Sequence, residues 1–171
     1  MRKLVLLIAV VGITAAIYVA SRHQSNISDA NVAPADHPPA AEFSLTDLSG
    51  QKLALASFKG KVVLLDFWAT WCDPCRAEIP HFVEMQNKYG KEGLQVVGIS
   101  MDDEEQPVRE FYNKFRMNYP VAVGDADIAR SYGGIFGLPV AFIIGRDGRI
   151  YGKHIGETSP DVLEKDIKKL L

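Results

Sequence analysis

The chain has 171 residues, of which 47% are hydrophobic, and it carries a formal net charge of −2. This length supports one domain with a hydrophobic core, and a charge so near zero gives no reason to expect a nucleic-acid partner. The only two cysteines, Cys72 and Cys75, lie in one short stretch. Any thiol chemistry of the chain is therefore confined to that stretch.

An apolar, uncharged run from Leu4 to Ala20 follows two basic residues at the start of the chain. The run is at the short end for a membrane-spanning helix and slightly long for the core of a signal peptide. We expect residues 1–20 to be an uncleaved, single-pass anchor in the inner membrane, with the rest of the chain in the periplasm. The alternative is a signal segment cleaved near Ala16 or Ala20, which would release the protein to the periplasm.

Residues 21–40 are polar and small, include three prolines and lack apolar periodicity. This composition favours a flexible linker, so the folded domain is expected over residues 41–171. Near its start, two short apolar segments flank the turn-forming residues Asp47-Leu48-Ser49-Gly50. The pattern predicts an opening hairpin.

Two apolar runs with a helical segment between them predict a parallel β–α–β unit. Val62–Trp68 and Leu94–Ser100 have the length and the β-branched content of buried strands. From Cys75 onward, apolar residues such as Ile79 and Phe82 recur at helical spacing. A strand pair joined by such a helix is expected to be parallel.

The acidic stretch Asp102–Glu105 suits the start of a helix, and we favour this interpretation over the alternative that the stretch binds a metal ion. Beyond it, short apolar runs alternate with turn-forming residues. These patterns predict a helix up to Phe115, an extended segment at Tyr119–Val123, a short helix near Ile128–Tyr132, strands within Gly137–Ile144 and Ile150–Ile155, and a final helix from Ser159 to Leu171. The expected fold is α/β, with a central mixed sheet and helices on both faces.

Cys72 and Cys75 lie where the first long strand turns into the helix. Backbone N–H groups and the positive end of the helix dipole stabilise a thiolate there, so we expect Cys72 to attack and Cys75 to resolve. A structural disulfide would also explain an even cysteine count, but so short a loop gains little from closure entropy. We predict a redox-active disulfide that needs no metal and no cofactor.

Two carboxylates are candidates for handling protons at this dithiol. Asp66 interrupts an apolar strand, which is costly without a purpose; the alternative is an Asp that reaches solvent at the strand end. Glu78 follows Cys75 by one helical turn; the alternative is an exposed Glu paired with Arg76 or a neighbouring lysine.

Three features together resemble thioredoxin: Trp-Cys-x-x-Cys after an apolar strand, a later strand led by Pro139, and a strand–strand–helix ending. The chain also resembles the TlpA/ResA-like thiol-disulfide oxidoreductases. The features shared with them are the apolar leader, the opening hairpin, the helix insertion after Ser100 and the sequence Cys-Arg-Ala-Glu-Ile-Pro. The resemblance covers residues 41–171. The resemblance implies a thioredoxin-like fold, redox activity and a cis bond between Leu138 and Pro139.

The resemblance also implies which residues act. Asp66 matches the buried acid of thioredoxin, six residues before the first cysteine, and Glu78 matches an acid that ResA-like proteins carry three residues after the second. We expect Trp71, Leu138 and Pro139 to bind substrate, with an aromatic residue, Phe136, on the other side of the groove.

Two positions depart from the family pattern. The residue after the family's cis-proline is often threonine and here is Val140, and the strand that follows often ends in Ile-Asp and here ends in Ile144-Gly145. Neither position carries the electron chemistry, so the departures concern the subfamily and the partner.

The expected function is reduction of disulfides in exported proteins, such as apocytochrome c or the copper-site cysteines of oxidase assembly. The resemblance implies a membrane electron donor of the DsbD/CcdA type. Asp73, between the two cysteines, disfavours a thiolate on Cys72 and so favours a reductant. The alternatives are a peroxiredoxin-like thiol peroxidase, which shares the fold, and a Sco-type copper carrier, which would want a wider cysteine spacing and a positioned histidine.

Overall fold

The computed structural model describes residues 37–171, so the expected anchor and nearly all of the expected linker lie outside the described residues. Within residues 37–171, no helix has the length and apolar character needed to cross a membrane. The folded unit includes the last residues assigned to the linker, since Ile150 donates its backbone N–H to the Pro38 carbonyl and Ala40 donates to Gly148, both at 2.9 Å.

A five-stranded mixed sheet with the strand order β5–β4–β3–β6–β7 forms the centre of the domain. The strands β3, β4 and β5 are parallel, and β6 runs antiparallel to both β3 and β7. Their bounds are β3 Val62–Trp68, β4 Leu94–Ser100, β5 Val121–Val123, β6 Val140–Ile144 and β7 Ile150–Ile155. The parallel β3–β4 pair confirms the predicted β–α–β unit, and β3, the central strand, is buried along its whole length.

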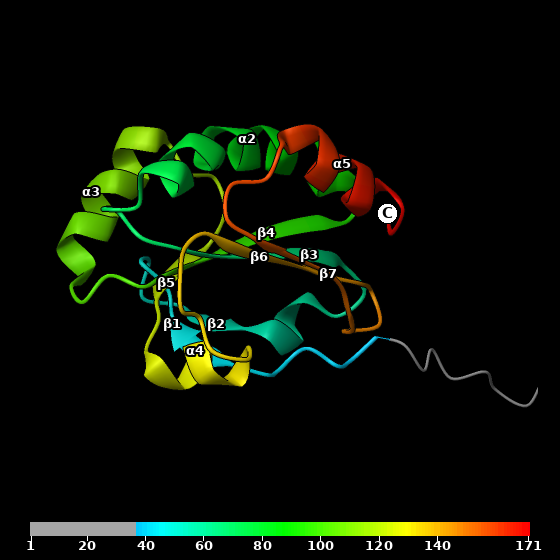
Figure 1. Cartoon of the computed structure of the whole chain (residues 1–171), viewed down its shortest axis with the longest axis horizontal. Coiled ribbons are helices and arrows are strands. Elements are labelled where there is room, and N and C mark those ends of the chain that lie inside the picture. Colours follow the sequence, from blue (N-terminus) through cyan, green and yellow to red (C-terminus); the bar gives the residue numbers. More distant parts are fainter. Residues whose placement is uncertain (1–36) are drawn as a thin grey trace, which may run out of the picture. The chain divides into compact units, whose positions relative to one another are not determined.

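Helices cover both faces of this sheet (Figure 1). One face carries α2, α3 and α5, and the other carries α4 and the two-stranded hairpin of β1 and β2. The bounds are β1 Ser44–Thr46, β2 Lys52–Ala54, α2 Asp73–Tyr89, α3 Glu105–Phe115, α4 Ala126–Ser131 and α5 Pro160–Lys168, with short 3₁₀ helices η2 at Leu55–Phe58 and η3 at Gly90–Glu92. A separate hydrophobic core lies on each side of the sheet, and the helices on both faces confirm the predicted arrangement (Figure 1).

The predicted hairpin is present, and its turn closes through one side chain. The Asp47 carboxylate accepts hydrogen bonds from the backbone N–H groups of Ser49 and Gln51, both at 2.8 Å, and from the Ser49 hydroxyl at 2.6 Å. Gly50 adopts a φ of 80°, which a residue without a Cβ atom accepts at no steric cost. The Leu48 N–H donates to the Val121 carbonyl at 2.9 Å, which holds this turn beside β5.

The helix α2 begins at Asp73, two residues before the start expected from its apolar spacing. Cys72 is the N-cap, and its sulfur accepts a hydrogen bond from the Cys75 N–H. Pro74 lies in the first turn, where its missing N–H leaves no intrahelical bond unmade. The early start places Cys72 directly at the positive end of the helix.

Candidate active site

The two cysteines form a disulfide at the N-terminus of α2. The Cys75 N–H lies 3.3 Å from the Cys72 sulfur, and the Arg76 N–H donates to the Cys72 carbonyl at 3.1 Å. Cys72 is 6% exposed and Cys75 only 1%. Cys72 thus has both the helix-terminal position and the better access that an attacking thiol requires.

A groove of about 590 Å³ opens in front of the dithiol. Its lining includes Cys72 but not Cys75, so a molecule in the groove meets the first cysteine. Trp71 is 68% exposed and Phe136 is 98% exposed, and exposed large apolar side chains of this kind mark interaction sites. The lining residues are Trp71, Cys72, Asp73, Pro74, Met101, Ile135, Phe136, Gly137 and Leu138.

The Leu138–Pro139 peptide bond is cis, which confirms the expectation from the resemblance. Leu138 lines the same groove as Cys72. Within residues 37–171 its backbone N–H and C=O take no backbone partner, whereas Gly156 donates its N–H to the Pro139 carbonyl at 2.9 Å. An extended segment in the groove could therefore pair with Leu138, in the manner of an added strand.

Asp66 lies inside β3 and is only 1% exposed, which rules out the alternative of a strand-end carboxylate in solvent. Its Oδ1 atom has no hydrogen-bond partner among the described residues. Burial raises the pKa of this carboxyl group well above its ordinary value, and the nearby charge of Glu78 raises it further. A carboxyl group in this state can take up a proton at a pH at which an exposed aspartate stays ionised.

Glu78 is also buried, at 5% exposure, on the inner face of α2. Its Oε1 accepts a hydrogen bond of 2.6 Å from the Thr158 N–H. Burial raises the pKa of Glu78, and the bond from Thr158 acts in the opposite direction. The alternative pairing with Arg76 is absent from the described residues, because Arg76 contacts Asp73 at the surface at 3.3 Å.

Asp102 is a buried carboxylate beside this site. The sequence does not reveal its contacts, because the acidic stretch that contains it predicts only the start of a helix. Its carboxylate accepts hydrogen bonds from the Thr70 N–H at 2.9 Å, the Thr70 hydroxyl at 2.6 Å and the Ser100 hydroxyl at 2.6 Å. The available signal was the Ser-x-Asp spacing at the end of a buried strand, because such short polar side chains favour local hydrogen bonds.

Comparisons with known proteins agree with this geometry. The family described as AhpC/TSA matches residues 37–153. The chain belongs to the AhpC/TSA family. It is 36% identical to the thiol-disulfide oxidoreductase ResA of Bacillus thuringiensis subsp. konkukian over 132 residues, which are 77% of this chain and 76% of that one.

Further relatives support the same assignment. The thioredoxin-like protein YneN of Bacillus subtilis is 35% identical, over 75% of this chain and 76% of its own. A solved structure of a thiol:disulfide interchange protein from Chlorobium tepidum TLS has a TM-score of 0.75 and 32% identity, covering 81% of this chain and 99% of that one. The chain is thus a ResA-like thiol-disulfide oxidoreductase with a thioredoxin-like fold and the Cys72–Cys75 pair as its dithiol.

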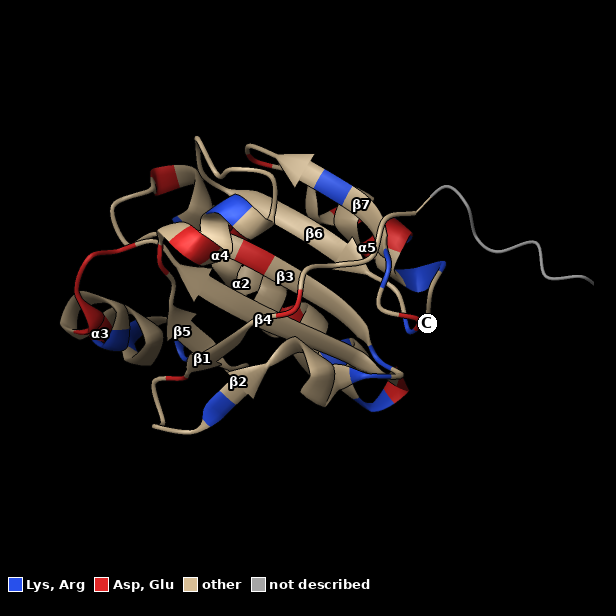
Figure 2. Ribbon diagram, turned by 90° about the horizontal axis from the view of Figure 1, so that it is seen from below, with Lys and Arg blue, Asp and Glu red and all other residues tan. Residues whose placement is uncertain are grey.

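Exposed acidic residues lie at the dithiol end of this oxidoreductase (Figure 2). Figure 2 shows the acidic stretch that leads into α3 at the end of the sheet where β3 and β4 finish. Within that stretch Asp103 and Glu104 are exposed, and so is Asp73 beside Cys72. Negative charge near Cys72 disfavours a thiolate on that residue. This electrostatic effect opposes that of the helix dipole.

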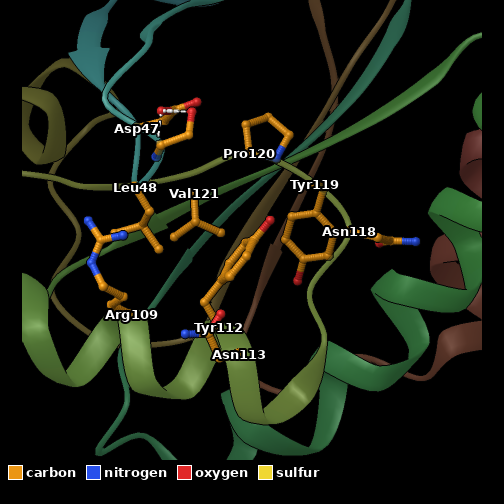
Figure 3. Close-up of a pocket in the computed structure, with 10 residues that line it drawn as sticks. Asp47, Leu48, Arg109, Tyr112, Asn113, Asn118, Tyr119, Pro120 and Val121 are labelled. Carbon is orange, nitrogen blue, oxygen red and sulfur yellow. Dashed lines mark hydrogen bonds between the residues drawn. The ribbon is translucent and has the colours of Figure 1, made fainter.

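A second cavity, of about 490 Å³, lies between the hairpin turn, α3 and the segment before β5 (Figure 3). Arg109 and Tyr112 of α3 line it together with Tyr119, and neither cysteine is part of its lining. The Tyr119 hydroxyl is buried without a hydrogen-bond partner among the described residues, and burial raises the pKa of this tyrosine well above its ordinary value. The cavity is separate from the groove that leads to Cys72.

Proposed function

We propose that this ResA-like oxidoreductase reduces disulfides of exported proteins from a membrane-tethered position. One observation carries the proposal: Cys72 opens on the groove, while Cys75 is buried behind it, one helical turn before Glu78, whose charge acts on the buried Asp66. This arrangement separates the thiol that meets substrate from the thiol that must lose a proton inside the protein. It suits a stepwise reduction of a bulky disulfide.

The reaction starts from the reduced protein. The Cys72 thiolate attacks one sulfur of the substrate disulfide, an S–S bond forms between protein and substrate, and the departing substrate thiolate takes up a proton. Cys75 then gives its proton to Asp66 or Glu78 and attacks the Cys72 sulfur. The mixed disulfide breaks, the second substrate sulfur leaves and is protonated, and two electrons have passed to the substrate. The Cys72–Cys75 disulfide is the product on the enzyme side.

The groove supplies the contacts that hold the substrate during these steps. Trp71 and Phe136 offer apolar surface, and Leu138 offers free backbone groups next to the cis-proline. An extended substrate segment would then lie across the opening to Cys72. Such docking favours protein or peptide disulfides over small ones.

The proposed setting follows from the start of the chain. The apolar run at residues 1–20 would hold the domain at the inner membrane, in the periplasm. Candidate substrates are apocytochrome c and the cysteines of copper-site assembly proteins. A membrane electron donor of the DsbD/CcdA type would supply the two electrons that each cycle consumes.

The test uses the full chain and its two cysteine variants. Cys72→Ser should abolish reduction of a disulfide-bonded protein, and Cys75→Ser should accumulate a mixed disulfide that mass spectrometry detects. Activity retained in Cys72→Ser but lost in Cys75→Ser would reverse the assignment. Consumption of peroxide or stoichiometric copper binding by the wild type would instead favour the peroxidase or the copper carrier, and cell fractionation would test the tether separately.

A further inference from the structure

The carboxylate of Asp102 joins the ends of two neighbouring strands. It accepts two hydrogen bonds from Thr70, which follows β3, and one from Ser100, the last residue of β4. The Asp102 N–H returns a bond of 3.1 Å to the Ser100 hydroxyl. A second link runs beside it, from the Met101 N–H to the Trp68 carbonyl at 2.7 Å. Asp102 is therefore fixed from both sides.

The Thr70 contacts reach the chain just before the attacking cysteine. Thr70 lies in the turn that the Cys72 N–H closes on the Ala69 carbonyl at 3.2 Å. Trp71, next to Thr70, extends into solvent and lines the groove. On the other strand end Met101, next to Asp102, lines the same groove. One carboxylate thus ties the Trp71–Cys72 wall of the groove to the Met101 wall.

We infer that Asp102 is a positioning residue that sets the spacing of these two walls and so governs the docking of peptide disulfides. It does not line the groove itself and acts through Thr70. The hydrogen bond from Cys75 to the Cys72 sulfur belongs to the first turn of α2 and does not involve Asp102. Loss of the Asp102 contacts should therefore weaken docking and leave the thiol chemistry of Cys72 unchanged.

The inference rests on the proposed use of the groove, and two substrates separate the two ideas. The first is an oxidised peptide with a Cys-x-x-Cys disulfide, which fills the groove, and the second is hydroxyethyl disulfide, which is too small to do so. In Asp102→Ala we expect KM for the peptide to rise about tenfold with kcat unchanged. The rate with hydroxyethyl disulfide should stay at its wild-type value. Thr70→Val removes one of the contacts but keeps the carboxylate charge, so it should leave the reduction potential of the dithiol unchanged.

Three milder variants complete the design. Asp102→Asn keeps one acceptor oxygen and Thr70→Val keeps the backbone donor, so each should raise the peptide KM by less than Asp102→Ala. Ser100→Ala removes the third hydrogen bond of the same carboxylate but keeps both bonds from Thr70, so its peptide KM should rise by less than in Asp102→Ala.

Equal KM values in all variants would overturn the inference, as would an equal loss with both substrates, a changed potential in Thr70→Val, or an increase of KM in Ser100→Ala as large as that in Asp102→Ala. A wild type that treats the peptide and the small disulfide alike would remove the groove proposal, and this inference with it.

Discussion

Asp66 lies in one of two neighbouring strands and Asp102 lies just beyond the end of the other, and the two carboxyl groups have opposite surroundings. Asp66 lies within β3, and Asp102 follows β4 by two residues. Both are buried, at 1% and 8% exposure. The Oδ1 atom of Asp66 has no partner among the described residues, whereas the Asp102 carboxylate accepts three hydrogen bonds.

The difference separates a group that can exchange a proton from a group that holds structure. A buried carboxyl group without donors is costly as an anion, so the pKa of Asp66 is raised and the group can bind a proton. The Asp102 carboxylate accepts hydrogen bonds from three donor groups and is thereby fixed in place. Its removal leaves those donors without a partner. Glu78 lies between the two cases, with one donor and a raised pKa.

The largest effect is expected at Asp102, whose carboxylate holds the surrounding structure in place. Asp102→Ala should lower the free energy of unfolding by about 2–4 kcal/mol, because it strands the Thr70 and Ser100 donors. Denaturant unfolding of the oxidised protein measures this. A variant as stable as the wild type would mean that solvent replaces these contacts and that the comparison fails.

Asp66→Asn should act on rate more than on stability. The amide cannot take up the proton of Cys75, so we expect resolution of the mixed disulfide to slow by about ten- to a hundredfold. Rapid mixing of the reduced variant with an oxidised substrate, across a range of pH, measures the step. Wild-type rates at every pH would refute a proton-handling role for Asp66.

The raised pKa of Asp66 should also change how the stability of the protein depends on pH, although this effect is smaller. Since the pKa of Asp66 is raised in the folded state, the native protein keeps a proton that the unfolded chain has lost. Stability then falls as pH rises from the ordinary Asp value of 3.8 to the raised folded value, and it levels off above that.

The Asp66→Asn variant lacks this loss. Its stability relative to the wild type should therefore increase with pH over that window, in unfolding experiments that begin near pH 4 and extend upward. A difference that stays constant, or one that shrinks as pH rises, would contradict the raised pKa.

Most of the fold and part of this contrast could be predicted from the sequence. The apolar run Val62–Trp68 predicted both the strand and the burial of Asp66, because period and composition report which residues face a core. The role of Asp102 escaped prediction, since its partner Thr70 is 32 positions away in the sequence and meets it only when β3 and β4 pair. Likewise, the donor to Glu78 comes from Thr158, 80 positions away.

Glu78→Gln tests the intermediate case. Gln keeps an acceptor oxygen for the Thr158 N–H, so the loop after β7 should keep its place. Only the proton capacity is lost, and Asp66 remains to accept the proton, so we expect resolution to slow only a few-fold. A loss larger than that of Asp66→Asn would make Glu78 the principal acceptor and reverse the order of the two acids.

The smallest effect is expected at the exposed acid beside the dithiol. Within residues 37–171 Asp73 forms its ion pair with Arg76, and its side chain is 90% exposed, so solvent screens its charge. Asp73→Asn removes a negative charge near Cys72 and stabilises the thiolate, which is the reduced form. The reduction potential should therefore rise by about 10–20 mV, toward a more oxidising protein. Glu92→Gln, which changes an exposed acid just before the start of β4 at the opposite end of the sheet, should leave the potential unchanged. A shift toward more reducing values in Asp73→Asn would show that Asp73 does not favour the reductant, and the proposed direction of electron flow would then depend on the buried acids alone.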